Sequence, residues 1–343
     1  CSDDDGDICD DCSNGSYDTY SECNLDIDVA LDEGANLISF YALPDDVSVE
    51  NIFDGADGVI GQGVGAVNIN GTWIGSLTEV SQDDGYWVKV SAAGTLSLTD
   101  AEPVNYDADG EVEYAIAYGN NLISYPFENG QGLEAGLGDN VANVYAIAGQ
   151  GVAALAINGS FVGSLTAFEG GNGYWLVASD DFNFSFAGVS DGLTRAKSVP
   201  RLLMEDFLNK KSTIPSEYSY AQSDQQAFFF VQNATIRGEA LEVDDIVIAY
   251  NGDVVVGSQY WNGKMTDVPA IGFDPKDPDK LAGYAEAGDK ISFKVFDAST
   301  GLLVDMDSDG DIKWEEKGIS IISLTDKYLP TEVSLSNAYP NPF

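Results

Sequence analysis

Gly61-Gln-Gly-Val-Gly-Ala-Val-Asn-Ile-Asn-Gly-Thr-Trp-Ile-Gly-Ser-Leu-Thr78 is the most informative stretch of this 343-residue chain, because it occurs twice. It returns as Gly149-Gln-Gly-Val-Ala-Ala-Leu-Ala-Ile-Asn-Gly-Ser-Phe-Val-Gly-Ser-Leu-Thr166, with 12 of the 18 aligned positions identical. In each stretch an Asn-Gly pair is flanked by apolar residues, which is a strong signal for a β-hairpin. The sequence therefore predicts the internal duplication of a small β-module.

The repeat extends to both sides of this hairpin. Asn36-Leu-Ile-Ser39 returns as Asn121-Leu-Ile-Ser124, and Gly85-Tyr-Trp-Val88 returns as Gly173-Tyr-Trp-Leu176. The offset between the copies is 85 residues at the start and 88 later, so three residues are inserted in the second copy.

Each copy is expected to fold as a β-module, over residues 31–104 and 112–188. Alternation along Tyr86–Val90 places Trp87 and Lys89 on one face of a strand and the other three side chains on the opposite face. The aromatic residues at matched positions, Trp73 with Phe161 and Trp87 with Trp175, have two interpretations, as core residues or as platforms for stacking carbohydrate.

A third folded unit is predicted over residues 226–326. Its strand candidates are short and closely spaced, as in an immunoglobulin-like β-sandwich. They are Phe228–Val231, Ile246–Tyr250, Val254–Val256 and Ile291–Phe296. The expected fold class is all-β: tandem small β-modules followed by an immunoglobulin-like sandwich.

Residues 189–225 are expected to link the second module to the third unit. They carry five of the 15 cations of the chain, and Ser198–Lys211 has a proline near its start and lysines at its end, which favours a short helix. This basic linker would contact an acidic surface or remain solvated.

Charge is distributed unevenly. Residues 1–194 hold one cation, Lys89, against 33 acids, for a net charge of −32, whereas the whole chain has a net charge of −42. So acidic a surface excludes nucleic acid as a favoured partner and indicates salt-rich or calcium-rich surroundings outside the cell. No apolar run is long enough for a transmembrane helix.

The chain has no histidine. This excludes Ser-His-Asp and Cys-His catalysis and histidine-ligated metal centres. A glycosidase mechanism needs only two carboxylates, but no pair of acids lies in a recognisable context, so no catalytic residue is assigned and the chain is not expected to be an enzyme.

Residues 1–30 form a segment rich in cysteine and aspartate. All four cysteines lie between Cys1 and Cys23, which indicates either a disulfide-stapled loop or a metal-thiolate site. The surrounding aspartates resemble the calcium repeats of thrombospondin-type segments, and the resemblance implies Ca²⁺ ligands at Asp3, Asp5, Asp7, Asp10 and Asp11. Cys1-Ser-Asp-Asp-Asp5 also resembles the mature start of bacterial surface lipoproteins, in which the first cysteine carries lipid.

A second calcium site is predicted within Asp305-Met-Asp-Ser-Asp-Gly-Asp-Ile-Lys-Trp-Glu-Glu316. The stretch fits the pattern D-x-D-x-D-G-x5-E, in which oxygen ligands surround a Ca²⁺ ion and the glycine allows a sharp turn. The ligands would be Asp305, Asp307, Asp309, the carbonyl of Asp311 and Glu316. The loop resembles EF-hand and dockerin loops in its ligands only, since a strand is expected to precede it.

The final segment, residues 327–343, ends in Tyr339-Pro-Asn-Pro-Phe343. This stretch resembles the start of the C-terminal sorting domain of cargo proteins of the bacterial type IX secretion system. The resemblance covers about 15 residues and implies export to the cell surface, not an activity.

Together these features predict a non-enzymatic, calcium-stabilised extracellular protein of a bacterial surface, acting in adhesion, a surface layer or a self-assembling filament. Its partner would be further copies of itself. The alternative is a carbohydrate-binding region of a secreted enzyme, with Trp73, Trp87, Trp175 and Trp261 as stacking residues.

Overall fold

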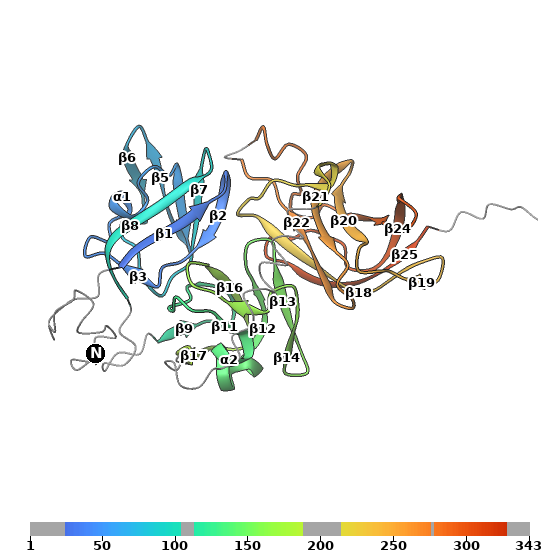
Figure 1. Cartoon of the computed structure of the whole chain (residues 1–343), viewed down its shortest axis with the longest axis horizontal. Helices are drawn as coiled ribbons and strands as arrows, with labels where there is room; N and C mark the ends of the chain where they lie inside the picture. Colours follow the sequence, from blue (N-terminus) through green and yellow to red (C-terminus); the bar gives the residue numbers. More distant parts are fainter. Residues whose placement is uncertain (1–24, 104–112, 188–213, 276–277, 328–343) are drawn as a thin grey trace, which may run out of the picture.

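The computed structural model describes residues 25–103, 113–187, 214–275 and 278–327. Its strands form three groups along the chain, which are the first module, the second module and the third unit (Figure 1). The all-β class is confirmed. The cysteine cluster, the predicted helix over 198–211 and the stretch 339–343 lie outside the described residues.

The repeated hairpins form as the Asn-Gly pairs predict. Asn70 and Gly71 have φ angles of 54° and 84°, and Asn158 and Gly159 have 52° and 81°. Positive φ at both central residues is the geometry of a type I′ turn, whose twist matches that of the flanking strands.

The first module consists of a five-stranded sheet in the order β2-β7-β4-β5-β6 and a three-stranded sheet in the order β1-β8-β3. The bounds of the five strands are β2 Gly34–Ile38, β7 Tyr86–Val90, β4 Gly58–Gly61, β5 Val64–Ile69 and β6 Thr72–Gly75. The other elements are β1 Leu25–Leu31, β3 Ala42–Leu43, β8 Gly94–Pro103 and the helical turn α1 Val49–Ile52. The module's core lies between its two sheets and α1.

The second module repeats the five-stranded sheet in the order β10-β16-β12-β13-β14. The bounds of these strands are β10 Gly119–Ile123, β16 Tyr174–Ala178, β12 Val144–Ala148, β13 Ala153–Ile157 and β14 Ser160–Gly163. Two strand pairs, β11-β15 and β17-β9, complete it. The remaining elements are β9 Tyr114–Ile116, β11 Gln131–Gly132, α2 Leu133–Leu137, η1 Gly138–Asn143, β15 Ala167–Phe168 and β17 Phe182–Phe184.

The third unit is an eight-stranded sheet that curls around its own core, as a β-sandwich encloses its core. The order is β19-β18-β25-β24-β23-β20-β21, with β22 paired to β18 and one parallel pair, β18 with β25. Its elements are η2 Ser216–Tyr218, β18 Gln226–Ile236, β19 Glu239–Ala240, β20 Ile246–Asn251, β21 Val254–Tyr260, β22 Thr266–Ile271, β23 Ser292–Asp297, β24 Leu302–Gly310 and β25 Ile319–Asp326.

The two modules are joined by reciprocal contacts, so a pseudo-two-fold axis relates them. The Gln62 Oε1 atom accepts a hydrogen bond of 2.7 Å from the Leu122 N–H, and the Gln150 Oε1 atom accepts one of 2.8 Å from the Leu37 N–H. Two isolated bridges, Ile38 with Asn172 and Asp84 with Ile123, repeat the same symmetry. The duplication therefore builds an internal dimer with an isologous interface.

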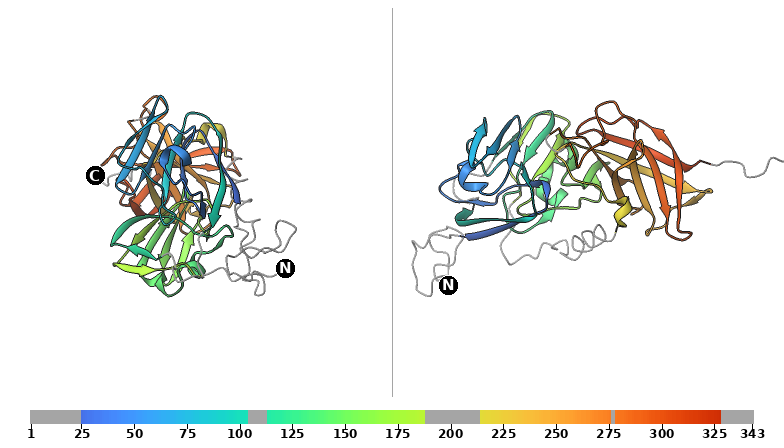
Figure 2. Two further views of the ribbon diagram at one scale, coloured as in Figure 1. Left: turned by 90° about the vertical axis from the view of Figure 1, so that its left-hand side faces the viewer. Right: turned by 90° about the horizontal axis from the view of Figure 1, so that it is seen from above.

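The third unit docks on the second module. An apolar cluster between them contains Leu155 and Trp175 of the module and Phe228 and Phe230 of β18. The third unit lies at the right of the molecule in Figure 1. It lies at the right again in the view from above, which is the right-hand picture of Figure 2.

Candidate functional site

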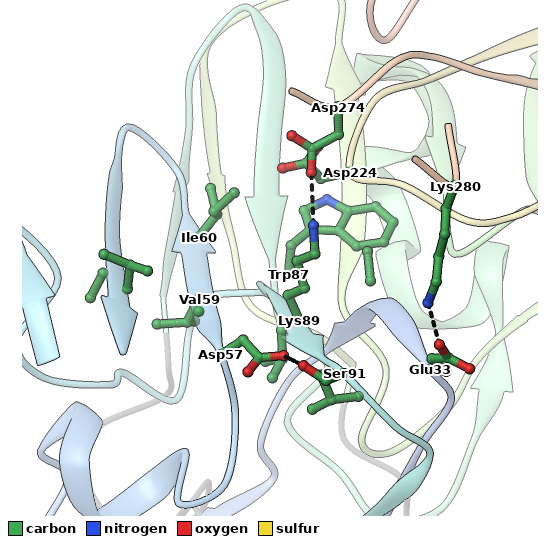
Figure 3. Close-up of a pocket in the computed structure, with 16 residues that line it drawn as sticks. Glu33, Asp57, Val59, Ile60, Trp87, Lys89, Ser91, Asp224, Asp274 and Lys280 are labelled. Atoms are coloured by element: carbon green, nitrogen blue, oxygen red, sulfur yellow. Dashed lines mark hydrogen bonds and ion pairs between the residues drawn. The ribbon is translucent and has the colours of Figure 1, made fainter. Parts of the chain in front are cut away.

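A cleft of about 790 Å³ opens over the outward face of the sheet in the first module (Figure 3). Its floor is apolar and its rim is charged, which is the usual character of a binding site. The floor is formed by side chains of the first module, among them Ala35, Ile60, Val67 and Trp87. Charged residues of both the first module and the third unit complete the lining: Glu33, Asp57, Lys89, Asp224, Asp274 and Lys280.

Strand alternation explains how β7 supplies this lining. Tyr86, Val88 and Val90 are buried in the core of the first module, whereas Trp87 belongs to the cluster on the other face of the sheet. Lys89 lies on the same outward face as Trp87 and lines the cleft. The predicted division of Tyr86–Val90 into two faces is thus confirmed.

Two ion pairs connect the first module to the third unit across the cleft. The Lys89 Nζ atom lies 3.4 Å from an Asp274 carboxylate oxygen, and Lys280 pairs with Glu33. On the rim of the first module, the Ser91 hydroxyl donates a hydrogen bond of 2.6 Å to Asp57. The only cation of residues 1–194 therefore serves a contact between two folded units.

A buried carboxylate holds the second module to the third unit. Asp267 in β22 is fully buried, and its two oxygens accept hydrogen bonds from the Ala153 N–H at 2.8 Å and the Ser164 N–H at 2.7 Å. The Ser164 hydroxyl donates a third hydrogen bond of 2.6 Å. Burial raises the pKa of Asp267 to about 7, although these hydrogen bonds oppose the shift.

A second acid with a raised pKa lies at the contact between the modules. Burial, assisted by the charge of Asp83, raises the pKa of Asp84 to about 6. Its neighbour Tyr86 accepts a hydrogen bond from the Ser81 N–H, and the matching Tyr174 accepts one from the Glu169 N–H. Burial raises the pKa of both tyrosines.

The indoles proposed for carbohydrate stacking are mostly core residues. The exposed fractions of Trp87, Trp175 and Trp261 are 3%, 7% and 6%, so these rings have no free face on which a sugar could stack. Among the described residues, only Trp87 and Trp175 have a buried side-chain nitrogen without a hydrogen-bond partner. Trp73 is half-buried and contacts Phe53, with ring centroids 6.4 Å apart.

The predicted calcium loop begins as a strand. Residues 305–310 continue β24, which pairs with β23 and β25, so the sharp turn expected at Gly310 is absent there. Because side chains alternate along a strand, Asp305, Asp307 and Asp309 lie on the same side of β24. The extended backbone spaces these three carboxylates along the strand and does not gather them around one point.

Four carboxylates of this stretch have lysine or backbone partners. Asp305 lies 3.1 Å from the Lys294 Nζ atom, Asp307 lies 3.8 Å from the Lys327 Nζ atom, and Glu316 lies 3.2 Å from the Lys317 Nζ atom. The Asp311 carboxylate accepts a hydrogen bond from the Lys313 N–H. Within the described ranges, no three acidic or cysteine side chains converge as metal ligands. Calcium binding here stays a prediction, and Asp3, Asp5, Asp7, Asp10 and Asp11 lie outside the described residues.

Sequence reasoning missed the residues that join the units. Gln62 and Gln150 carried a signal, because a glutamine between two glycines is identical in both copies. Asp267 carried a weaker one, as the lone charge within the buried strand Thr266–Ile271. Nothing in the sequence pairs Lys89 with Asp274, 185 residues away.

Comparison with known proteins identifies no relative. No protein-family model matches the chain, and neither a curated protein nor a solved structure matches it. In the part of the chain that the structure describes, no helix is long and apolar enough to cross a membrane.

Proposed function

We propose that this chain is a non-catalytic structural protein of the extracellular surface of a bacterium, in which a pair of β-modules carries a docked β-domain. The observation that carries the proposal is that several charged and buried polar side chains form contacts between folded units. Asp267, Lys89, Gln62 and Gln150 all join folded units to one another, as expected of a structural protein.

The extracellular location rests on composition and on the C-terminal resemblance. A net charge of −42 suits a medium in which salt or divalent ions screen the carboxylates. Calcium is part of the proposal because of the pattern D-x-D-x-D-G-x5-E at residues 305–316 and the aspartates of the first 11 residues. Adhesion, a surface layer and a filament are the roles that such a protein would serve.

Electron microscopy of the full chain, with calcium and after chelation, tests this function. We expect ordered assemblies in calcium that disperse when a chelator is added. A chain that stays monomeric in calcium, with no change of melting temperature or mass on chelation, would contradict the proposal.

The cleft favours carbohydrate as the second candidate. Its volume accommodates a small ligand, and a polar rim around an apolar floor suits a sugar ring. A glycan array with the full chain should then show binding that Asp57→Ala abolishes, while Asp139→Ala, at a distant exposed acid, retains it. An array without any binder removes this alternative.

A further inference from the structure

The duplication provides an internal comparison of one binding site. In the second module the Ala153 N–H, the Ser164 N–H and the Ser164 hydroxyl donate hydrogen bonds of 2.8, 2.7 and 2.6 Å to the Asp267 carboxylate. The matching residues of the first module are Gly65 in β5 and Ser76 directly after β6. Two of the donors are backbone groups and the third is a serine present in both copies, so the first module has the same three donors.

In the first module these donors turn toward each other. The Gly65 N–H donates to the Ser76 hydroxyl oxygen over 3.3 Å, which is longer than the usual range for such a bond. The Ser76 N–H donates to the Gly65 carbonyl oxygen over 2.9 Å. Within the described ranges, no carboxylate accepts a hydrogen bond from either residue.

A carboxylate can replace these internal bonds at low cost. Binding requires the Ser76 N–H to leave the Gly65 carbonyl, but that carbonyl keeps a second hydrogen bond of 3.2 Å from the Leu77 N–H. The second module shows this arrangement, because there the Ala153 carbonyl accepts 3.0 Å from the Leu165 N–H while the carboxylate is bound. Hydrogen bonds to a charged acceptor are stronger than neutral ones, which favours the exchange.

The position of these donors leaves them accessible to a ligand. Ser76 is exposed, Gly65 is half-buried, and the neighbouring Ala66 lines the cleft. The site therefore borders open space at the edge of the cleft, whereas its counterpart is covered by the third unit.

The local charge permits a carboxylate here, although the chain is acidic. Residues 58–78 contain no charged side chain. In Figure 3, Ile60, the partner of Gly65 in the sheet, lies apart from the acids Asp224 and Asp274 of the third unit. The second module already binds the Asp267 carboxylate in a chain of the same net charge, so three well-placed donors are sufficient.

The occupied site also shows what kind of molecule carries the carboxylate. Asp267 belongs to strand β22, which pairs with β18, and Phe228 and Phe230 of β18 pack on the same module. The ligand is thus an acidic side chain of a polypeptide strand. Because Asp267 is engaged by the second module, the first module requires a carboxylate from another source.

We propose that the Gly65 and Ser76 N–H groups, with the Ser76 hydroxyl, form a binding site for a carboxylate, and that its ligand is an aspartate or glutamate side chain of a partner polypeptide. The inference goes beyond the proposed structural function and does not depend on calcium. Its failure would leave calcium-dependent assembly untouched.

Amide NMR spectra of the isotope-labelled full chain test the inference, with sodium acetate as the first probe. We expect saturable shifts of the Gly65 and Ser76 amide signals that neither acetamide nor sodium chloride at equal ionic strength produces. Ser76→Ala removes one donor and should raise the dissociation constant of acetate about threefold. The control Ser160→Ala, at an exposed serine of the second hairpin, should leave it unchanged.

A synthetic peptide of residues 262–273, which contains β22, distinguishes a polypeptide carboxylate from a free one. The peptide should shift the same two amide signals at about tenfold lower concentration than acetate, because its backbone and apolar side chains add contacts. The same peptide with Asp267→Asn lacks the charge and should bind more weakly.

Four results would overturn the inference. They are acetate shifts no larger than those of chloride, a Ser76→Ala variant that binds acetate like the wild type, peptide shifts confined to Ala153 and Ser164, and equal binding of the two peptides. Acetate binding without peptide binding would refute the polypeptide ligand. The melting temperature of each variant verifies that it is folded.

Discussion

Asp267 joins the third unit to the second module through three hydrogen bonds. Its carboxylate satisfies two backbone N–H groups and one hydroxyl of the second module inside a buried interface. Buried donors without partners are costly, and so is a buried carboxylate without donors. The interface is therefore stable only when the Asp267 carboxylate and its donors in the second module are both present.

Replacing Asp267 with alanine should lower the free energy of unfolding by about 3 kcal/mol, because the Ala153 and Ser164 N–H groups would lose their acceptors. Asp267→Asn keeps one acceptor oxygen and should lose less. Urea denaturation of the full chain measures both values. An alanine variant as stable as the wild type would show that the hydrogen bonds contribute nothing.

The raised pKa of Asp267 predicts a pH dependence of stability. The folded protein holds the proton up to about pH 7, whereas an exposed aspartate releases it near its ordinary pKa of 3.8. The folded state therefore binds more protons between these values, and the contribution of this group to stability falls as pH rises through that window. Above pH 7 the contribution is constant again.

The comparison of wild type with Asp267→Asn isolates this effect from the general repulsion among acids. We expect the unfolding free energy of the wild type, minus that of the variant, to decrease from pH 5 to pH 7.5 at constant ionic strength. Asp84, with its pKa near 6, adds a similar but separate slope to both proteins. A difference that stays level or increases with pH would contradict the assignment.

At the scale of elements, the repeated hairpin depends on one close approach. A Cβ atom at Gly163 would lie 2.2 Å from the Ala153 carbonyl oxygen, and one at the matching Gly75 would lie 2.1 Å from the Gly65 oxygen. Only glycine allows the end of the second hairpin strand to fold so closely over the first strand, which explains why Gly-Ser-Leu-Thr is retained in both copies.

Gly163→Ala should accordingly destabilise the protein by about 2–4 kcal/mol, since the backbone must shift and φ at this position is 143°. Gly94→Ala is the matched control, because a Cβ atom there meets nothing within 4 Å. Thermal unfolding of both variants checks the expectation. Equal melting temperatures for the two would rule out the steric explanation.

At the scale of the whole molecule, docking of the third unit breaks the symmetry of the module pair. Trp87 and Trp175 occupy equivalent positions, but Lys317 of the third unit lies 3.8 Å from the centroid of the Trp175 ring, whereas the cleft opens beside Trp87. Lys89 takes the position that Val177 has in the second module, and it pairs with Asp274 of the third unit. The third unit thus packs directly on the sheet face of the second module, whereas a cleft separates part of it from the sheet face of the first module.

Calcium should stabilise the molecule as a whole, because its carboxylates repel one another when no ion lies among them. We expect millimolar calcium to raise the melting temperature by several degrees, and Asp309→Ala to reduce that increase. Glu239→Ala, an exposed acid outside the pattern, should not. Magnesium at equal ionic strength distinguishes binding from screening. A wild-type melting temperature that does not change with calcium would contradict the prediction that the chain binds calcium.

Much of the fold could be predicted from short stretches of sequence. The Asn-Gly turns, the two faces of Tyr86–Val90 and the all-β class follow from local rules of turn geometry and strand alternation. The extent of β24 could not be predicted, because its ligand-like spacing of aspartates is also the alternation of an exposed strand face. Pairing with β23 and β25 decided between the two.

By itself the sequence determined that two copies of one β-module stand in the chain and how each hairpin turns, because these properties depend on residues a few positions apart. Only the tertiary structure decided which sheet face is covered and which is left open over a cleft. That choice depends on Asp267, Phe228 and Lys89 meeting surfaces that are distant in the chain, as the separations of 114 residues for Asp267 to Ala153 and 185 residues for Lys89 to Asp274 illustrate. Such contacts form only when whole surfaces fit, so no local pattern encodes them.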